Sequence, residues 1–293
     1  MSEANPYQDF VAGFARLLAD GQTLGAPPTV FPHRAAPAPD APRCLIFSPH
    51  PDDEVLTGAL PLRLRRAGWW VGNVAVTLGS ARGRRVQRLA ELRAACAYLG
   101  FQVLLPRAEG FENINLQGRQ ADPVGWAAAA AEIAALLTTH APALILMPHA
   151  GDWNRTHIGT HWLVQDALAR MPAGFHCRVL ESEFWGAMSD PNLLVESTPA
   201  EVAELVAALS LHRGEVARNP YHLRLPAWMM DNVRRGAELV GGQGAAAPDF
   251  VFATLYRLGA WQARRWQAAW AGGRFLSGAE PADRNLGPAH PSG

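Results

Sequence analysis

Short apolar runs alternate with amphipathic segments over the first 211 residues. The runs that predict strands are 43–48, 70–78, 102–105, 143–147 and 176–181. Apolar residues at helical spacing predict helices at 7–18, 55–67, 84–99, 123–139, 157–170 and 199–211. Strands this short, separated by amphipathic helices, are typical of βαβ units. The pattern therefore predicts an α/β fold, a Rossmann-like doubly wound sheet that is mostly parallel with helices on both faces.

The alternation ends after residue 211. Helices are expected at 228–240 and 259–271, with a strand-like run at 250–256, and the tail is rich in Pro, Gly and Ala. We predict an N-terminal helix and Pro/Ala-rich connector at 1–41 and an α/β core at 42–211. A mostly helical extension at 212–276 is expected to pack on the core, followed by a disordered tail at 277–293.

Composition narrows the possible chemistry. The 26 basic residues balance the 26 acidic ones, which argues against nucleic acid as a partner. The chain contains no lysine, so a Schiff-base lysine and a phosphate-loop lysine are excluded. Its three cysteines, Cys44, Cys96 and Cys177, are widely spaced and favour reduced core residues. No apolar run is long enough to span a membrane, and the N-terminus lacks a basic leader, so we expect a cytoplasmic protein.

One imidazole and three carboxylates follow the first apolar strand within five residues. The segment is His50-Pro51-Asp52-Asp53-Glu54, after Cys44-Leu45-Ile46-Phe47. Buried carboxylates are costly unless they are paired or bind a cation. A metal ion is the simplest partner for such a cluster.

A second polar loop follows the fourth predicted strand. It runs from Pro148 to His157, with His161 one helical turn further. If the first strand is central in the sheet, its neighbours are the second and fourth strands, and this loop then lies beside His50. His50, Asp53 and His157 would form a set of two imidazoles and one carboxylate, which suits zinc or another divalent first-row metal. Asp52 would remain free to take a proton from bound water.

Plainer interpretations remain open for each group. The acidic residues 52–54 can be a helix cap and first turn favoured by the helix dipole. His157 can be a packed core histidine, and His161, on the same helix face, can be a core residue, a ligand or a hydrogen-bond partner of a ligand. His149 can simply line a pocket.

At these residues the chain resembles the PIG-L/LmbE-like N-acetylglucosaminyl deacetylase family of zinc hydrolases. The resemblance covers roughly residues 44–211 and rests on His-Pro-Asp-Asp-Glu after a strand, Arg88-Leu89-Ala90-Glu91-Leu92 opening a helix that ends in Leu99-Gly100, and His157. It implies that residues 42–211 form the catalytic core, that His50, Asp53 and His157 bind Zn2+, and that Asp52 is the general base. Arg88, with Arg85 as the alternative, would contact substrate.

The resemblance has one departure. Where the family has the first His of His-Pro-Asp-His, this chain has Asn154, which can donate a hydrogen bond to an oxyanion but cannot shuttle a proton. Either His149, His161 or a C-terminal histidine then protonates the leaving amine, or Asp52 performs both proton transfers.

The implied function is deacetylation of an N-acetylated amino sugar or glycoconjugate, with Asp52 activating a zinc-bound water. The expected partner is a small N-acetylglucosamine-type substrate, and assembly into a homo-oligomer is left open. Two alternatives stand beside it. One is a metal-dependent amidase acting on a thiol conjugate or another N-acyl small molecule; the other is a catalytically weakened binding or accessory protein, with Asn154 as its mark.

Overall fold

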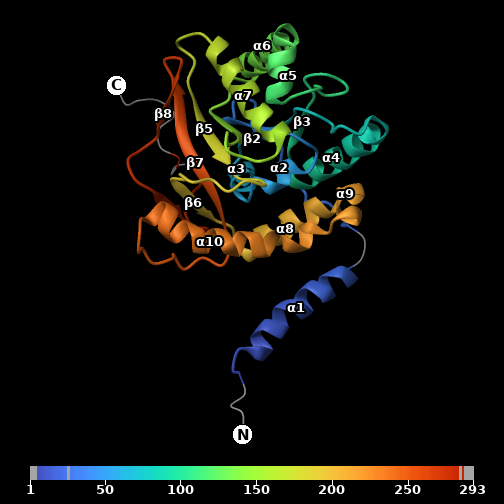
Figure 1. The fold of residues 1–293 in the computed structure, drawn as a ribbon, viewed down its shortest axis with the longest axis vertical. Helices are drawn as coiled ribbons and strands as arrows, with labels where there is room; N and C mark the ends of the chain where they lie inside the picture. The colour runs from blue at the N-terminus through green and yellow to red at the C-terminus, as the bar shows by residue number, and fades with distance from the viewer. Residues whose placement is uncertain (1–4, 25–26, 284–285, 287–293) are drawn as a thin grey trace.

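The computed structural model describes residues 5–24, 27–283 and 286, and in them the strands form one mixed sheet (Figure 1). The strand order is β3-β2-β1-β4-β5-β7-β6-β9, and β8 pairs with β7 outside this path. The strands are β1 (Arg43–Ser48), β2 (Trp70–Ala75), β3 (Gln102–Leu104), β4 (Leu144–Pro148), β5 (Cys177–Ser182), β6 (Leu193–Glu196), β7 (Ala253–Gln262), β8 (Arg265–Ala268) and β9 (Arg274–Leu276).

Strand β1 is central in the parallel half of the sheet. It pairs in parallel with β2 on one side and with β4 on the other, so the sheet order reverses at β1, as the sequence predicts. Its side chains alternate between two cores: Cys44 and Ile46 belong to one, Leu45 and Phe47 to the other. Because both faces are covered, the strand is apolar along its length. The doubly wound α/β prediction is confirmed.

Helices cover both faces of the sheet (Figure 1). They are α1 (Gln8–Thr23), α2 (Asp53–Leu56), α3 (Leu60–Arg66), α4 (Arg85–Leu99), α5 (Leu116–Ala121), α6 (Pro123–His140), α7 (Arg155–Arg170), α8 (Pro199–Ser210), α9 (Arg213–Arg218) and α10 (Leu225–Gly241), with 3-10 turns η1 (Arg82–Arg84) and η2 (Tyr221–Arg224). The single helix expected at 55–67 is two helices. Gly58 breaks it at φ +78, where a Cβ atom would lie 2.2 Å from Oγ1 of Thr254.

The sequence predicts a mostly helical C-terminal extension, but the structure combines helices and strands there. The helix predicted at 259–271 is instead the end of β7 and a hairpin to β8, and β7 runs antiparallel between β5 and β6. The turn residues Ala263 and Arg264 have φ of 51° and 61°. Two-residue hairpin turns with positive φ usually carry Asn or Gly, so this sequence gives no turn signal.

The tail begins as ordered structure, which corrects the prediction of disorder from residue 277. The guanidinium of Arg63 donates to the carbonyl oxygens of Ser277 and Glu280, at 2.8 and 2.5 Å. Ala282 and Leu286 are buried. The remainder of that prediction, residues 284–285 and 287–293, lies outside the described residues.

Helix α1 extends away from the rest of the molecule, and its C-terminal end lies beside Leu223 of η2 (Figure 1). Phe10, Phe14 and Leu17 on this helix are exposed. Within the described part of the chain, no helix combines the length and the apolar character needed to cross a bilayer.

Candidate metal centre

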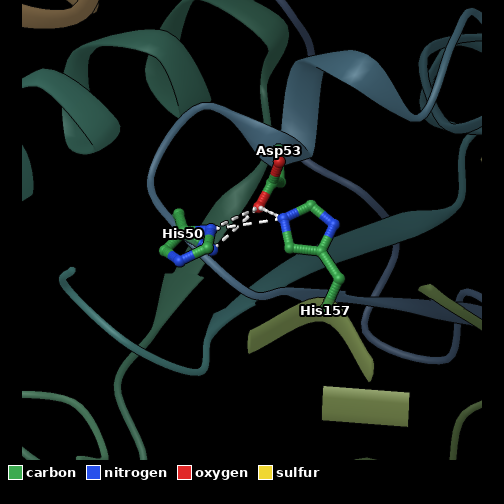
Figure 2. Close-up of side chains that lie close together, drawn as sticks. All are labelled: His50, Asp53 and His157. Carbon is green, nitrogen blue, oxygen red and sulfur yellow. Dashed lines mark hydrogen bonds and ion pairs between the residues drawn. The ribbon is translucent and has the colours of Figure 1, made fainter. Parts of the chain in front are cut away.

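Three side chains meet at the carboxyl end of β1. His50 lies in the turn after the strand, Asp53 is the first residue of α2, and His157 lies in the first turn of α7. Oδ2 of Asp53 is 3.3 Å from Nδ1 of His50 and 3.2 Å from Nε2 of His157, and these two nitrogens are 3.3 Å apart (Figure 2). Residues 107 positions apart in the sequence thus present their ring nitrogens to one carboxylate oxygen.

This spacing fits a divalent ion. Donors bound tetrahedrally to one zinc ion, at about 2.0–2.2 Å, lie about 3.3–3.6 Å from one another. The three measured separations are 3.2, 3.3 and 3.3 Å, close to the lower end of that range. Two imidazoles and one carboxylate suit zinc and other first-row divalent ions. Among the described residues, these three form the one His/Cys/Asp/Glu group that could hold a metal ion.

Asp152 supports His157 from behind. Its Oδ2 atom lies 3.5 Å from Nδ1 of His157 and also accepts from the backbone N–H of Trp185, while Oδ1 accepts from the N–H of Asn154. A proton on Nδ1 directed at Asp152 leaves the Nε2 lone pair facing Asp53. In the sequence, only its place in the same loop as His157 marks Asp152.

Asp52 lies beside the three-residue cluster in a constrained backbone conformation. It has φ 113°, an uncommon value for a residue other than glycine, and its N–H donates to Oε2 of Glu54. Its Oδ2 accepts a 2.5 Å hydrogen bond from the hydroxyl of Tyr221, and Arg88 lies 4.0 Å from Oδ1. Arg88 is held by a 3.0 Å bond to the carbonyl oxygen of Pro51. No motif or spacing in the sequence indicates that Tyr221 lies here.

Burial and neighbouring charges shift the pKa values of the two adjacent aspartates in opposite directions. Burial and the neighbouring Asp53 raise the pKa of Asp52 to about 7. Burial opposes ionisation of Asp53 as well, but His157 and His50 hold its pKa well below the usual range. The pKa of His157 would fall on burial alone, yet Asp53 and Asp152 raise it to about 10. Asp53 is therefore the anionic centre of the cluster, and Asp52 can exchange a proton near neutral pH.

Glu54 is fully paired below the cluster. Its Oε1 atom lies 2.7 Å from Nε2 of His212, and both side chains are buried. Burial opposes the charge on His212, but Glu54 raises its pKa above the ordinary value. This ion pair joins the turn after β1 to the segment between α8 and α9.

The other candidate site residues bond to protein groups outside the three-residue cluster. Nε2 of His149 is 2.9 Å from the carbonyl oxygen of Gly186, and Nδ1 of His161 faces Pro148 and Glu181. Asn154 is the N-cap of α7, where its Oδ1 accepts from the N–H groups of Thr156 and His157. Arg85 bonds to Gly79 and Glu112 rather than to the cluster. Among the proposed substrate-contacting residues, Arg88 is the one that lies next to Asp52.

Comparison with known families supports the resemblance. Residues 45–168 match the family model PIG-L, described as GlcNAc-PI de-N-acetylase. The match spans β1 to α7 and so contains His50, Asp52, Asp53 and His157, whereas Tyr221 and His212 lie beyond it. No curated protein sequence matches the chain closely enough to count as a relative.

Several solved structures share the fold. N,N'-diacetylchitobiose deacetylase from Pyrococcus horikoshii is 15% identical, with a TM-score of 0.55 over 88% of this chain and 94% of that one. The zinc-inhibited form of teicoplanin deacetylase Orf2 is 18% identical, with a TM-score of 0.54 over 74% and 97% of the two chains. GalB, the 4-carboxy-2-hydroxymuconate hydratase from Pseudomonas putida KT2440, is 17% identical, with a TM-score of 0.53 over 74% and 95%. At these identities the likeness establishes the fold alone.

Proposed function

Because residues 45–168 carry a PIG-L family domain, we propose that this protein is a metal-dependent N-deacetylase, a hydrolase of linear amide bonds that acts on an N-acetylated amino sugar or glycoconjugate. The family model and the deacetylases among the structural neighbours support this reaction class. The observation that carries the proposal is the set of three donor atoms on His50, Asp53 and His157, 3.2–3.3 Å apart.

Those three residues would hold the metal, with zinc as the proposed ion. When bound, such an ion polarises the acetyl carbonyl and makes water a stronger acid near neutral pH. Asp152 would help to orient His157, because its carboxylate lies 3.5 Å from the far ring nitrogen and favours a proton there.

Asp52 is the proposed general base. It is next to a candidate ligand in the chain, yet its carboxylate bonds to Tyr221 rather than joining the three-donor set. With a pKa raised to about 7 by burial and Asp53, it can accept a proton from the attacking water and return it later in the cycle.

Asp52 is also the proposed donor to the leaving amine. The other candidates are less suited, since His149 and His161 each use a ring nitrogen on a carbonyl oxygen of the protein. Asn154 uses its side-chain oxygen as a helix cap, which leaves its NH2 group as a donor to the developing oxyanion. Arg88, close to Asp52, is the proposed contact to the substrate.

The decisive experiment combines metal analysis with amine release. Purified protein is assayed for bound metal, and new primary amine is measured with N-acetylglucosamine and its glycosides. We expect zinc to be bound, chelation to abolish activity, added Zn2+ to restore it, and Asp52→Asn to lower kcat by about 10²–10⁴-fold. The matched control, Asp190→Asn, alters an exposed carboxylate paired with Arg257 and should behave as wild type. Metal-loaded protein that releases no amine from any N-acetylated sugar would contradict the proposal.

A panel of other substrates tests the alternatives. An N-acyl thiol conjugate that reacts while N-acetylated sugars do not would favour the broader amidase. A folded protein that binds these sugars without turning them over would favour an accessory role. Because a hydratase shares this fold, water addition to an unsaturated carboxylic acid belongs in the same panel.

A further inference from the structure

A cavity of about 980 Å³ lies beside the candidate metal centre. A smaller one of about 280 Å³, lined in part by His50 and Thr156, adjoins it. The two cavities share the lining residues Arg82, Arg85, Phe111, Glu112, Asn113, Ile114 and Asn115. The loop at residues 111–115 thus borders both cavities, of which the smaller is lined by His50 and the larger by Trp126.

The cavity lies on one side of the metal centre. Its walls come mainly from the loop after β3 and from α5 and α6, whereas Asp152 lies in the loop after β4 and His157 in the first turn of α7. Since β1 lies between β2 and β4, the cavity occupies the β2–β3 side of His50. A substrate whose amide reaches the metal centre can therefore extend sideways into it.

The wall of the cavity is fixed relative to the metal centre. The N–H of Phe111 donates to the carbonyl oxygen of Val76 at 2.8 Å. On α7, two residues after His157, a Cβ atom on Gly159 would lie 2.2 Å from the carbonyl oxygen of Ile114. The loop therefore rests directly on the helix that carries His157, and a ligand would meet a preformed wall rather than one it must order.

The lining is polar, and most of its charges are paired. Its charged groups are the arginines 82, 85, 107 and 155 and the carboxylates 109, 112 and 122. Arg82 and Arg85 both bond to Glu112, and Arg107 bonds to a further carboxylate, Glu132. The lining thus holds four positive charges and three negative ones, and Glu132, outside the lining, offsets the charge of Arg107. Amide side chains also line the cavity, whereas the rings of Phe111 and Trp126 are buried, so the wall offers mainly polar groups, which suit hydroxyl groups.

We propose that this cavity binds sugar residues linked to the reacting one, so that the substrate is an oligosaccharide rather than a single N-acetylated sugar. The inference rests on the proposed function, because it takes His50 as the position of the reacting amide. The volume supports it: pockets that enclose a whole drug-sized ligand measure about 300–1,000 Å³, and this cavity is near the upper limit before the metal centre is included.

The test compares substrates that contain different numbers of sugar residues. kcat/KM is measured with N-acetylglucosamine, with the fully N-acetylated β-1,4-linked tetramer and with N-octanoylglucosamine. We expect the tetramer to exceed the monosaccharide by at least about tenfold, equivalent to about 1.4 kcal/mol. Ala121→Trp fills the cavity from its exposed rim and should reduce that ratio towards one. The matched control is Ala128→Trp, exposed on α6 and not part of the lining, and it should keep the ratio. Equal values for monosaccharide and tetramer, a preference for the octanoyl compound, or no effect of Ala121→Trp would overturn the inference.

A binding assay separates the two proposals. Calorimetric titration of Asp52→Asn with the tetramer measures occupancy without turnover. Tetramer binding that Ala121→Trp weakens, in a protein that deacetylates nothing, supports the cavity while the proposed function fails. Monosaccharide turnover by wild type with no gain for the tetramer leaves the proposed function standing and rejects the oligosaccharide inference.

Discussion

The hydroxyl of Tyr221 donates a 2.5 Å hydrogen bond to Oδ2 of Asp52, across 169 residues of sequence. Tyr221 belongs to η2, outside the matched family domain at residues 45–168. Burial and Asp52 raise the pKa of Tyr221, so its phenol stays protonated and remains a donor. The position of the proposed base therefore depends on a segment beyond the residues that match the family model.

Tyr221→Phe removes this bond. A hydrogen bond to the charged carboxylate lowers the pKa of Asp52, so its loss raises that pKa and moves the acid limb of the kcat/KM profile to higher pH. We expect a shift of about one pH unit, since one unit corresponds to about 1.4 kcal/mol and charge-assisted bonds contribute about 1.5–3 kcal/mol. Tyr7→Phe, at an exposed position before α1, is the control. Superimposable profiles would show that Tyr221 has no part in positioning the base.

Asp152→Asn tests the support behind His157. An amide is a weaker acceptor for the Nδ1 proton than a carboxylate, so His157 is held less firmly. We expect metal affinity to fall about 10–100-fold, measured by competition with a chromogenic chelator. Asp190→Asn, which alters an exposed carboxylate, should leave affinity unchanged. A metal affinity equal to wild type in folded Asp152→Asn would remove Asp152 from the centre.

Sequence patterns bear on the local half of the candidate site. His50, Asp52 and Asp53 follow one apolar strand, and the alternation of strands and helices places the loop of His157 beside them. Tyr221 contacts Asp52 across 169 residues of sequence, and His212 contacts Glu54 across 158. No spacing or motif marks such contacts, because they depend on how η2 and the segment after α8 pack against the turn after β1.

In the fold, too, local patterns are predicted more readily than features without a local signal. The parallel strands β1–β5 are short apolar runs with helices between them, and they were predicted. The antiparallel strand β7 was partly mistaken for a helix, because its apolar residues continue across a turn formed by Ala263 and Arg264. Ordinary side chains at positive φ conceal a hairpin from any pattern based on turn residues.

Metal binding should release a proton from His157. In the metal-free protein its pKa is raised to about 10, so the ring is protonated at neutral pH, whereas a ligand nitrogen must be free of its proton. Affinity should therefore rise with pH between 6 and 8. Calorimetry in buffers of different ionisation enthalpy measures the protons released directly. A metal affinity that stays constant over this range would mean that metal binding releases no proton from His157.

Asn154→Ala should destabilise the start of α7. The side chain accepts from the N–H groups of Thr156 and His157, and losing an N-cap costs about 0.5–2 kcal/mol of unfolding free energy. Denaturant unfolding of the metal-free protein measures this loss. Asn154→Asp keeps an acceptor at the cap and should retain most of the stability. If Asn154→Ala unfolds at the same denaturant concentration as wild type, the cap is not what this residue contributes.

The buried pair of His212 and Glu54 should make stability depend on pH. Burial disfavours the imidazolium, but Glu54 outweighs it and raises the pKa of His212 above its ordinary value. A raised folded-state pKa gives stability that is complete below the unfolded value of about 6.5 and is lost as pH rises through the folded value. His212→Gln should therefore lower the unfolding free energy most at pH 6, by about 3–5 kcal/mol, and less at alkaline pH. Denaturant titrations of the metal-free protein across this range measure the difference, with the exposed His33→Gln as the control. A difference between wild type and His212→Gln that widens with increasing pH would mean that His212 is neutral in the folded protein and that its bond to Glu54 is not an ion pair.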